Sequence, residues 1–382
     1  MRILHCIWAM RGGGAERQLA YLAPALAERG HDVHLALVFP GVNSDRLRQS
    51  LCSVHRIDAA GRYDPRVVPR LVMLTRRLRP DVIHTWMTQM DILGGGAARL
   101  LGIPWIVSER SVGLNYPPSV LHSIRVAAGR RATRVLPNSV EGANYWQAHG
   151  VPPARIEVIP NCVPVRDIEA AQPVVDHRIA SDDEVVLVVG RLSHEKNLDT
   201  LVIALRQLVR VRPRMKVFFC GDGPLLRALE NQVGEAGLAE RVVFAGFVSN
   251  VAPWLKRARV LVAVSLWEGH PNAVLEAMAA GTPVVVSDIP SFRSVLDEES
   301  AWFAPASDAS AIANALGRVL ASPAEAARRA RNAKANLQGA SVDVTVTRYE
   351  DAYRRAIGAC HGPRRGSAGS AGSAARHAAV RH

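Results

Sequence analysis

The segment Glu268–Glu276 reads EGHPNAVLE and carries two carboxylates, one at each end, between an apolar run and a helical stretch. The apolar run, 260–267, is typical of a buried strand, and residues 273–280 are good helix formers. Glu268 is therefore expected on the loop that leaves the strand, and Glu276 inside the helix. Open α/β sheets bind ligands at the carboxyl ends of their parallel strands. A helix N-terminus favours an anion, and two carboxylates can accept hydrogen bonds from hydroxyl groups, so the segment suits a sugar nucleotide.

The chain of 382 residues is long for one hydrophobic core, which favours two domains. Its 48% hydrophobic and 21% charged residues are typical of a soluble globular protein. The five cysteines are dispersed, which favours a reducing compartment and disfavours a zinc site. The N-terminal MRILHCIW reads as a strand, and no apolar run reaches the roughly 20 residues that span a bilayer. We expect a cytoplasmic protein, at most peripheral on the inner face of the plasma membrane.

The formal net charge of +13 is compatible with three anionic partners: nucleic acid, a small anionic ligand and an anionic membrane surface. Aromatic residues make up only 5% of the chain, and no DNA- or RNA-reading motif occurs, so we expect no nucleic-acid partner. Part of the positive charge comes from the low-complexity tail 361–382, which contains no acidic residue and is expected to be disordered.

Short β-branched runs alternate with helical stretches along the chain, which is the pattern of parallel α/β units. In the first half we expect strands at 2–8, 32–39, 54–58, 81–86, 105–109 and 134–137, with helices that include 15–29, 67–79 and 90–101. In the second half we expect strands at 184–190, 215–220, 241–245, 260–266 and 283–287, with helices at 197–211, 225–236, 273–280, 308–320, 323–337 and 341–358. A Pro-bearing stretch, 159–172, reads as the linker. The predicted fold class is α/β, with two tandem Rossmann-like, doubly wound domains that face each other across a cleft.

A Gly-rich loop, MRGGGAER at 10–17, follows the first predicted strand and opens a helix. Gly13 and Gly14 let backbone N–H groups approach a phosphate or a sugar, although a tight turn needs the same residues. The spacing is not a dinucleotide fingerprint, because Arg17 stands where the third glycine would be.

A basic loop, VGRLSHEKN at 189–197, lies at another strand end. Gly190 turns the chain, so that Arg191 and Lys196 can converge on a diphosphate and neutralise its charge as it departs. The alternative is a solvated basic loop, which the position above the sheet disfavours. The chain contains no D-x-D motif, no P-loop and no G-x-S-x-G motif, so we expect neither a metal nor another cofactor.

Other strand ends carry further candidate contacts. Gly223, in GDGP, allows a nucleotide to come near or serves only the turn, and the backbone around Phe247 can meet a flat base. His84, Glu109 and Arg110 end strands of the first half and so face the cleft. A histidine there is often structural, however, and Glu109 can form a salt bridge with Arg110.

Taken in order, GGGAER, GRLSHEKN, GDGP and EGHPNAVLEAMAAGTPV resemble the motifs of the family 4 glycosyltransferases, over residues 1–358. This family has the GT-B fold and transfers a sugar from a nucleotide-diphosphate donor, with retention at the anomeric carbon and without a metal. The resemblance implies an acceptor domain at 1–165 and a donor domain at 166–340. It also implies that a C-terminal helix, 341–360, crosses back to the first domain around Tyr349.

The motif positions imply roles for individual residues. Arg191 and Lys196 would hold the donor diphosphate, Glu268 would bind the sugar hydroxyls, and Glu276 would bind the ribose hydroxyls. Arg191, Lys196 and Glu268 form the predicted catalytic set. The predicted donor-binding set is Gly13, Gly14, Gly190, Arg191, Lys196, Gly223, Phe247, Glu268, Gly269, Asn272, Ala273 and Glu276.

One position departs from many relatives, which carry a histidine near the strand end that here reads Ser108-Glu109-Arg110. A subset that resembles bacterial surface-polysaccharide and oligosaccharide transferases has S-E-R there and a Trp after H-T, as in Thr85-Trp86. That subset commonly uses UDP-sugars. The resemblance therefore favours UDP over GDP, and a glycan or lipid-linked saccharide as acceptor, with His84, Glu109 and Arg110 on the acceptor side.

The stretch 117–134 combines apolar residues with four arginines, Arg125, Arg130, Arg131 and Arg134. It is either a membrane-facing helix or a solvated, Arg-rich one. Two other functions stay open: a sugar-nucleotide epimerase on the same fold, and a non-catalytic sugar-nucleotide-binding protein. The intact donor motifs argue against the second.

Overall fold

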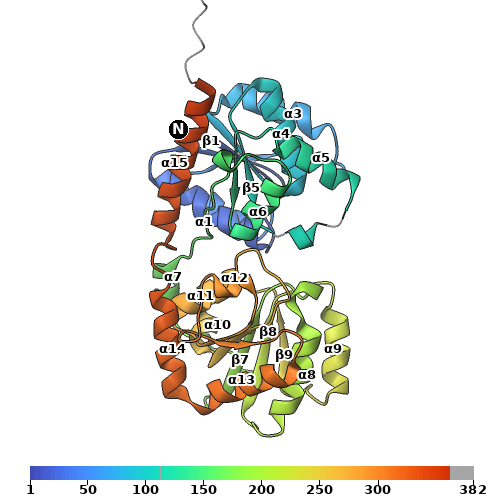
Figure 1. Ribbon diagram of the computed structural model, residues 1–382, viewed down its shortest axis with the longest axis vertical. Coiled ribbons are helices and arrows are strands. Elements are labelled where there is room, and N and C mark those ends of the chain that lie inside the picture. The colour runs from blue at the N-terminus through green and yellow to red at the C-terminus, as the bar shows by residue number, and fades with distance from the viewer. Residues whose placement is uncertain (112, 117, 362–382) are drawn as a thin grey trace, which may run out of the picture.

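The computed structural model describes residues 1–111, 113–116 and 118–361, and it contains two α/β domains, one above the other in Figure 1. Each domain is built on a six-stranded sheet, with the strand orders β3-β2-β1-β4-β5-β6 and β12-β11-β10-β7-β8-β9. All neighbouring strands are parallel. In each sheet the order reverses beside the first strand of the domain, which makes both sheets doubly wound. The predicted fold class is confirmed.

The central strands of the first sheet are almost entirely buried, as expected for a parallel sheet covered by helices on both faces. Its strands are β1 (Arg2–Ala9), β2 (Asp32–Phe39), β3 (Ser53–Arg56), β4 (Val82–Trp86), β5 (Trp105–Glu109) and β6 (Arg134–Pro137). Its helices are α1 (Gly14–Glu28), α2 (Ser44–Arg48), α3 (Val67–Leu78), α4 (Met87–Leu101), α5 (Val120–Gly129) and α6 (Val140–Ala148), with 3-10 turns η1 (Gly113–Asn115) and η2 (Pro153–Arg155).

The second domain repeats this plan. Its strands are β7 (Glu184–Val189), β8 (Met215–Cys220), β9 (Val242–Gly246), β10 (Val260–Ala263), β11 (Val284–Ser287) and β12 (Trp302–Ala304). Its helices are α7 (Val165–Ala170), α8 (Leu198–Val209), α9 (Leu226–Glu235), α10 (Ala252–Arg257), α11 (Asn272–Ala280), α12 (Pro290–Arg293), α13 (Ala309–Ala321) and α14 (Pro323–Ala335), with the 3-10 turn η3 (His194–Lys196). The edge strand β12 was not predicted, because three residues give no periodic signal. Strand β10 ends before the predicted position, since the chain leaves the sheet there to form the loop that carries Glu268.

The first crossing between the domains is shorter than the predicted linker, 159–172. Ile159 is buried in the core of the first domain, and Val163 is already buried in the core of the second. Helix α7 then packs on the second domain, because Ile168 finds an apolar core to enter. The chain returns near Ser341, which forms a parallel bridge with Val163.

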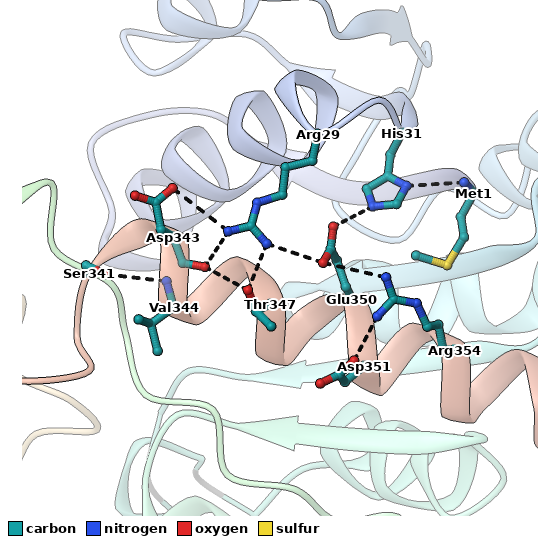
Figure 2. Close-up of polar contacts among 10 residues, drawn as sticks. All are labelled: Met1, Arg29, His31, Ser341, Asp343, Val344, Thr347, Glu350, Asp351 and Arg354. Carbon is teal, nitrogen blue, oxygen red and sulfur yellow. Dashed lines mark hydrogen bonds and ion pairs between the residues drawn. The ribbon is translucent and has the colours of Figure 1, made fainter.

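Helix α15 (Val342–His361) runs back along the first domain (Figure 1). Its apolar face, including Val346 and Tyr349, is buried in that domain's core. Figure 2 shows the polar contacts of this helix with the end of α1, where Glu350 accepts from His31 at 2.7 Å and from Arg29 at 3.3 Å. The second crossing is therefore fixed by both apolar packing and ion pairs.

The predicted disordered tail, 361–382, lies outside the described residues except for His361, which ends α15. Within the described part of the chain, no helix combines the length and the apolar character that a bilayer crossing requires.

Candidate active site

The loops that follow β1, β7 and β10 meet between the two domains, where the strand order of each sheet reverses. They line a cavity of about 340 Å³, which we call the smaller cavity. A second cavity of about 930 Å³, the larger cavity, shares several of its lining residues, including Arg17, Arg110 and Arg191. The predicted cleft is thus present, and it is lined by side chains from both domains.

Most of the predicted site residues lie at these cavities. The smaller cavity is lined by Gly13, Gly14, Arg110, Gly190, Arg191, Lys196, Glu268, Gly269, Asn272 and Ala273. Three more, Glu109, Gly223 and Phe247, line only the larger cavity. His84 and Glu276 line neither.

The loop after β7 holds Lys196 in place through the residue that follows it. Asn197 has φ 55°, and its side chain donates to the carbonyl oxygens of Val264 at 3.1 Å and Ala306 at 2.7 Å. These bonds compensate for the left-handed backbone and fix the loop against the neighbouring strand ends. Gly190 has φ 148°, a conformation that other residues rarely adopt, so the turn before Arg191 depends on glycine.

Lys196 and Glu268 come from different motifs and meet in the smaller cavity. The Glu268 carboxylate accepts hydrogen bonds from the Lys196 ammonium and from Ser265, the latter at 2.9 Å. The Lys196 and Glu268 side chains keep 23% and 18% of their surface exposed. The pair is therefore oriented by the protein and still open to a ligand.

The N-terminus of α11 faces the same cavity, because Asn272 and Ala273 line it. The Asn272 side-chain oxygen accepts hydrogen bonds from Asn161 at 2.7 Å and from Gln18 at 3.2 Å. The helix start is thus tied both to the first crossing and to α1. Its dipole adds positive potential beside Arg191 and Lys196, which suits an anionic group.

The Gly-rich loop closes the cavity from the first domain, but one of its N–H groups is already used. Gly13 donates its backbone N–H to the carboxylate of Glu16, which caps the start of α1. Burial raises the pKa of Glu16. The Gly13 N–H group is therefore not free for a ligand in this conformation, and the predicted approach of a phosphate or a sugar to the loop stays a prediction.

Gly223 and Phe247 make contacts within the protein that the sequence did not indicate. A side chain at Gly223 would collide with the backbone of Leu192, so this glycine is required by close packing of two loops. Phe247 is 44% exposed, and its ring lies so close to Gly12 that it would have to move to admit a side chain there. The Phe247 ring thus packs on the Gly-rich loop, and the predicted contact of the backbone around Phe247 with a base stays a prediction.

His84 is fully buried in the first domain, so its predicted place on the acceptor side is wrong. Its Nδ1 atom lies 2.9 Å from the Tyr353 hydroxyl of α15. Burial, followed by the neighbouring His5 and Arg110, lowers the pKa of His84 well below its usual value. This histidine is a neutral core residue.

Glu109 is also fully buried, and it pairs with Arg125 instead of the predicted Arg110. The Arg125 guanidinium lies 2.9 Å from Glu109 and 2.8 Å from Asp91. Tyr116 donates to Glu109 at 2.6 Å. Burial raises the pKa of Asp91, while the guanidinium opposes that rise. Because Arg125 is buried in this network, its predicted place on a membrane-facing surface is wrong.

Of the three acceptor-side candidates, Arg110 lines both cavities. Its guanidinium stacks over Trp86 at 4.6 Å from the ring centroid and donates to Asn161 at 2.9 Å. It also donates to the Tyr349 hydroxyl of α15. The C-terminal helix therefore helps to orient a cation that lines both cavities.

Two residues that sequence reasoning missed also line the smaller cavity. Arg17 donates to both oxygens of Glu276, at 2.7 and 2.8 Å, across a sequence separation of 259 residues. His270 has a buried Nδ1 atom without a hydrogen-bond partner among the described residues. Burial and then Arg110 lower its pKa to about 4, so the imidazole is neutral and able to accept a hydrogen bond. In the described residues, no three His, Cys, Asp or Glu side chains form a group that could hold a metal ion.

Two family models match the chain in succession. The model described as Glycosyltransferase Family 4 matches residues 12–167, and the one described as Glycosyl transferases group 1 matches residues 174–336. The chain is 30% identical over 276 residues to 2-deoxystreptamine glucosyltransferase from Streptomyces kanamyceticus, an alignment that covers 66% of this chain and 71% of that protein. The chain belongs to the family 4 glycosyltransferases.

This glycosyltransferase is also 29% identical over 274 residues to an Escherichia coli enzyme, UDP-Gal:alpha-D-GlcNAc-diphosphoundecaprenol alpha-1,3-galactosyltransferase. That alignment covers 65% of this chain and 68% of the relative. Its fold is similar to that of HepE from Anabaena, solved in complex with UDP-glucose, with a TM-score of 0.81 and 20% identity over 92% of this chain and 98% of HepE. The resemblance inferred from the motifs is confirmed.

Proposed function

We propose that this glycosyltransferase is a retaining enzyme that transfers a sugar from a UDP-sugar to a glycan or lipid-linked saccharide, without a metal ion. The observation that carries the proposal is the smaller cavity, where Arg191, Lys196 and Glu268 lie together at the N-terminus of α11. The choice of UDP is supported by the UDP-Gal in the name of the Escherichia coli relative and by the UDP-glucose bound to HepE.

Arg191 and Lys196 would hold the donor diphosphate. Two cations and a helix N-terminus supply the charge neutralisation that a departing diphosphate needs, and a partly enclosed cavity strengthens it. Glu268 would accept hydrogen bonds from sugar hydroxyls, since its carboxylate is ordered by Lys196 and Ser265 yet partly exposed. The neutral His270 imidazole is a further acceptor for a hydroxyl in this cavity.

In the proposed reaction the acceptor hydroxyl attacks the anomeric carbon from the face that the diphosphate leaves. The bond from the anomeric carbon to the diphosphate oxygen breaks, and the diphosphate keeps the electron pair. One of its oxygens takes the hydroxyl proton as the new glycosidic bond forms on the same face, so the configuration is retained and no protein nucleophile is required. Closure of the two domains would exclude water and align the reactants.

The part of the larger cavity that the first domain lines is the proposed acceptor site. It adjoins the smaller cavity at Arg110 and Arg191 and is also lined by Met87, Thr88 and Gln89 at the start of α4. Met87 has φ 72°, an uncommon backbone conformation for this residue type, and such strain concentrates at functional sites. The name of the Escherichia coli relative includes a diphosphoundecaprenol-linked saccharide, which supports a lipid-linked acceptor.

A membrane-facing surface next to this site is part of the proposal. Leu114, Val120, Leu121 and Ile124 are exposed apolar residues of η1 and α5, close in sequence to Tyr116, which lines the larger cavity. The exposed Arg130 and Arg131 follow on the same stretch. Apolar side chains beside arginines suit an anionic membrane surface. The fraction of protein that co-sediments with vesicles should rise with their anionic lipid content and fall in Leu121→Asp. Vesicle binding that is the same in both cases would contradict the proposal of a membrane-facing surface.

The reaction is tested by offering UDP-hexoses and UDP-N-acetylhexosamines in EDTA, with soluble glycans or a lipid-linked saccharide. The proposal predicts UDP release that depends on the acceptor, and a product whose anomeric configuration, read by NMR, matches that of the donor. Inversion would contradict the mechanism. Conversion of the UDP-sugar without an acceptor would favour the epimerase, and UDP binding without turnover would favour a binding protein.

A further inference from the structure

The carboxylate of Glu276 is not accessible from the smaller cavity. Arg17 donates to both of its oxygens, at 2.7 and 2.8 Å, and only 5% of the Glu276 side chain is exposed. Arg17 itself is 21% exposed and lines both cavities, whereas Glu276 lines neither. The guanidinium therefore lies between the carboxylate and the space that a donor would occupy.

The Arg17–Glu276 pair joins the two domains. Arg17 is in the first turn of α1, and Glu276 is in the middle of α11, on facing sides of the two domains (Figure 1). The Coulombic attraction of Glu276 raises the pKa of Arg17, so the guanidinium stays charged at neutral pH. Two parallel hydrogen bonds between a guanidinium and a carboxylate are among the stronger polar contacts in proteins.

Other contacts hold the same interface without this pair. Gln18 donates to Asn272 at 3.2 Å and to the Cys162 carbonyl oxygen at 2.9 Å. It also accepts the Cys162 N–H at 2.8 Å. Because α1 stays tied to α11 and to the first crossing, loss of the pair should leave the fold intact.

We infer that Arg17 controls access of the donor to Glu276: ribose hydroxyls and the Arg17 guanidinium compete for one carboxylate, and donor binding releases the interdomain pair. The inference rests on the proposed function and on the ribose-binding role that the motif resemblance implies for Glu276. A ligand that needs this carboxylate can bind only those molecules in which the carboxylate is not paired with Arg17. Its apparent affinity is therefore the intrinsic affinity multiplied by the fraction of molecules in which the pair is open. Release also removes one interdomain contact, so donor binding and the position of the first domain are coupled.

The opposite role for Arg17 makes a different prediction. If Arg17 oriented Glu276 for the ribose, or bound the donor phosphates itself, its removal would weaken UDP binding. If it competes with the ribose, its removal strengthens UDP binding. The sign of the change in the dissociation constant therefore decides between the two roles.

The experiment is calorimetric titration of UDP into the full-length protein and into Arg17→Met, which keeps the length of the side chain but removes its charge. We expect the dissociation constant to fall about tenfold, as it would if the pair were closed in about nine molecules out of ten. Arg17→Lys, which keeps the charge but loses the bidentate geometry, should give an intermediate value. An unchanged or higher dissociation constant in Arg17→Met would overturn the inference.

Arg46→Met is the matched control. Arg46 also links α2 of the first domain to α7, through Asp167 at 3.9 Å, but it lines neither cavity, so UDP binding should not change. Glu276→Gln separates the inference from the proposed function. If Glu276→Gln leaves UDP binding unchanged, the ribose role of Glu276 is wrong. If it weakens binding, and the tighter binding of Arg17→Met disappears in the Glu276→Gln background, the competition is confirmed.

Discussion

The two sheets have the same strand order, yet they use the carboxyl ends of their strands differently. In the second domain, Lys196 and Glu268 pair with each other and keep part of their surface in the smaller cavity. In the first domain, Glu109 and Arg125 are buried with Asp91 at the border of the larger cavity. A charged residue at a strand end thus supports binding or folding, depending on whether a second element covers it. Here α5 brings Arg125 over the first sheet, and nothing comparable covers Lys196 among the described residues.

This difference predicts where substitutions affect folding and where they affect catalysis. The first-domain charges are desolvated and satisfied by one another, so their loss should lower stability. The second-domain charges are partly exposed, so their loss should leave stability nearly unchanged and reduce turnover.

Arg125→Met should produce the largest effect. It removes the cation that two buried carboxylates share, and an uncompensated buried charge costs about 3–5 kcal/mol of unfolding free energy. Denaturant unfolding measures the loss. Arg131→Met, on the exposed end of the same stretch, is the control and should change the unfolding free energy by less than about 0.5 kcal/mol. Equal effects of the two substitutions would remove the distinction between the domains.

Lys196→Ala should have the next largest effect. Loss of a cation from the departing diphosphate should lower kcat by about 10² or more, with little change in the midpoint of thermal unfolding. Lys334→Ala, at an exposed ion pair of α14, is the matched control and should keep full activity. Near-normal turnover in Lys196→Ala would show that the pair in the cavity is not the catalytic one.

Buried histidines of the first domain should contribute to the pH dependence of stability. This effect is expected to be smaller than those of Arg125→Met and Lys196→Ala. Burial lowers the pKa of His5 to about 3, so the folded protein stays unprotonated there while the unfolded chain takes up a proton below its pKa of 6.5. The unfolded state then binds more protons between these values, and stability falls as the pH falls from 6.5. At pH 5.5 this amounts to about 1.4 kcal/mol for His5.

His5→Asn should therefore reduce the slope of the unfolding free energy against pH below 6.5. The reduction should correspond to about one fewer proton taken up on unfolding, whatever the effect of the substitution on absolute stability. The comparison substitution is His177→Asn, because the side chain of His177 is 92% exposed. Identical slopes in wild type and His5→Asn would contradict the assignment.

The sequence predicted the sheets and the placement of Lys196 and Glu268 on strand-end loops because those signals are local. Alternating strands and helices give the two Rossmann-like domains, and the motifs around Lys196 and Glu268 both follow strands that meet where the order reverses. The pairing of Glu109 with Arg125 was not predicted, since it depends on how α5 packs. Arg17 was noted only as a departure from a glycine fingerprint, because its partner Glu276 lies in the other domain.

Thermal unfolding of the purified protein with UDP in the presence of EDTA tests most directly that the second domain holds a nucleotide diphosphate without a metal. A ligand that binds only the folded state adds about 2.7 kcal/mol of stability at 100 times its dissociation constant. We predict this stabilisation in wild type and in Glu109→Gln, and its loss in Lys196→Ala. No stabilisation by millimolar UDP, or its loss in Glu109→Gln as fully as in Lys196→Ala, would contradict the assignment of the donor site.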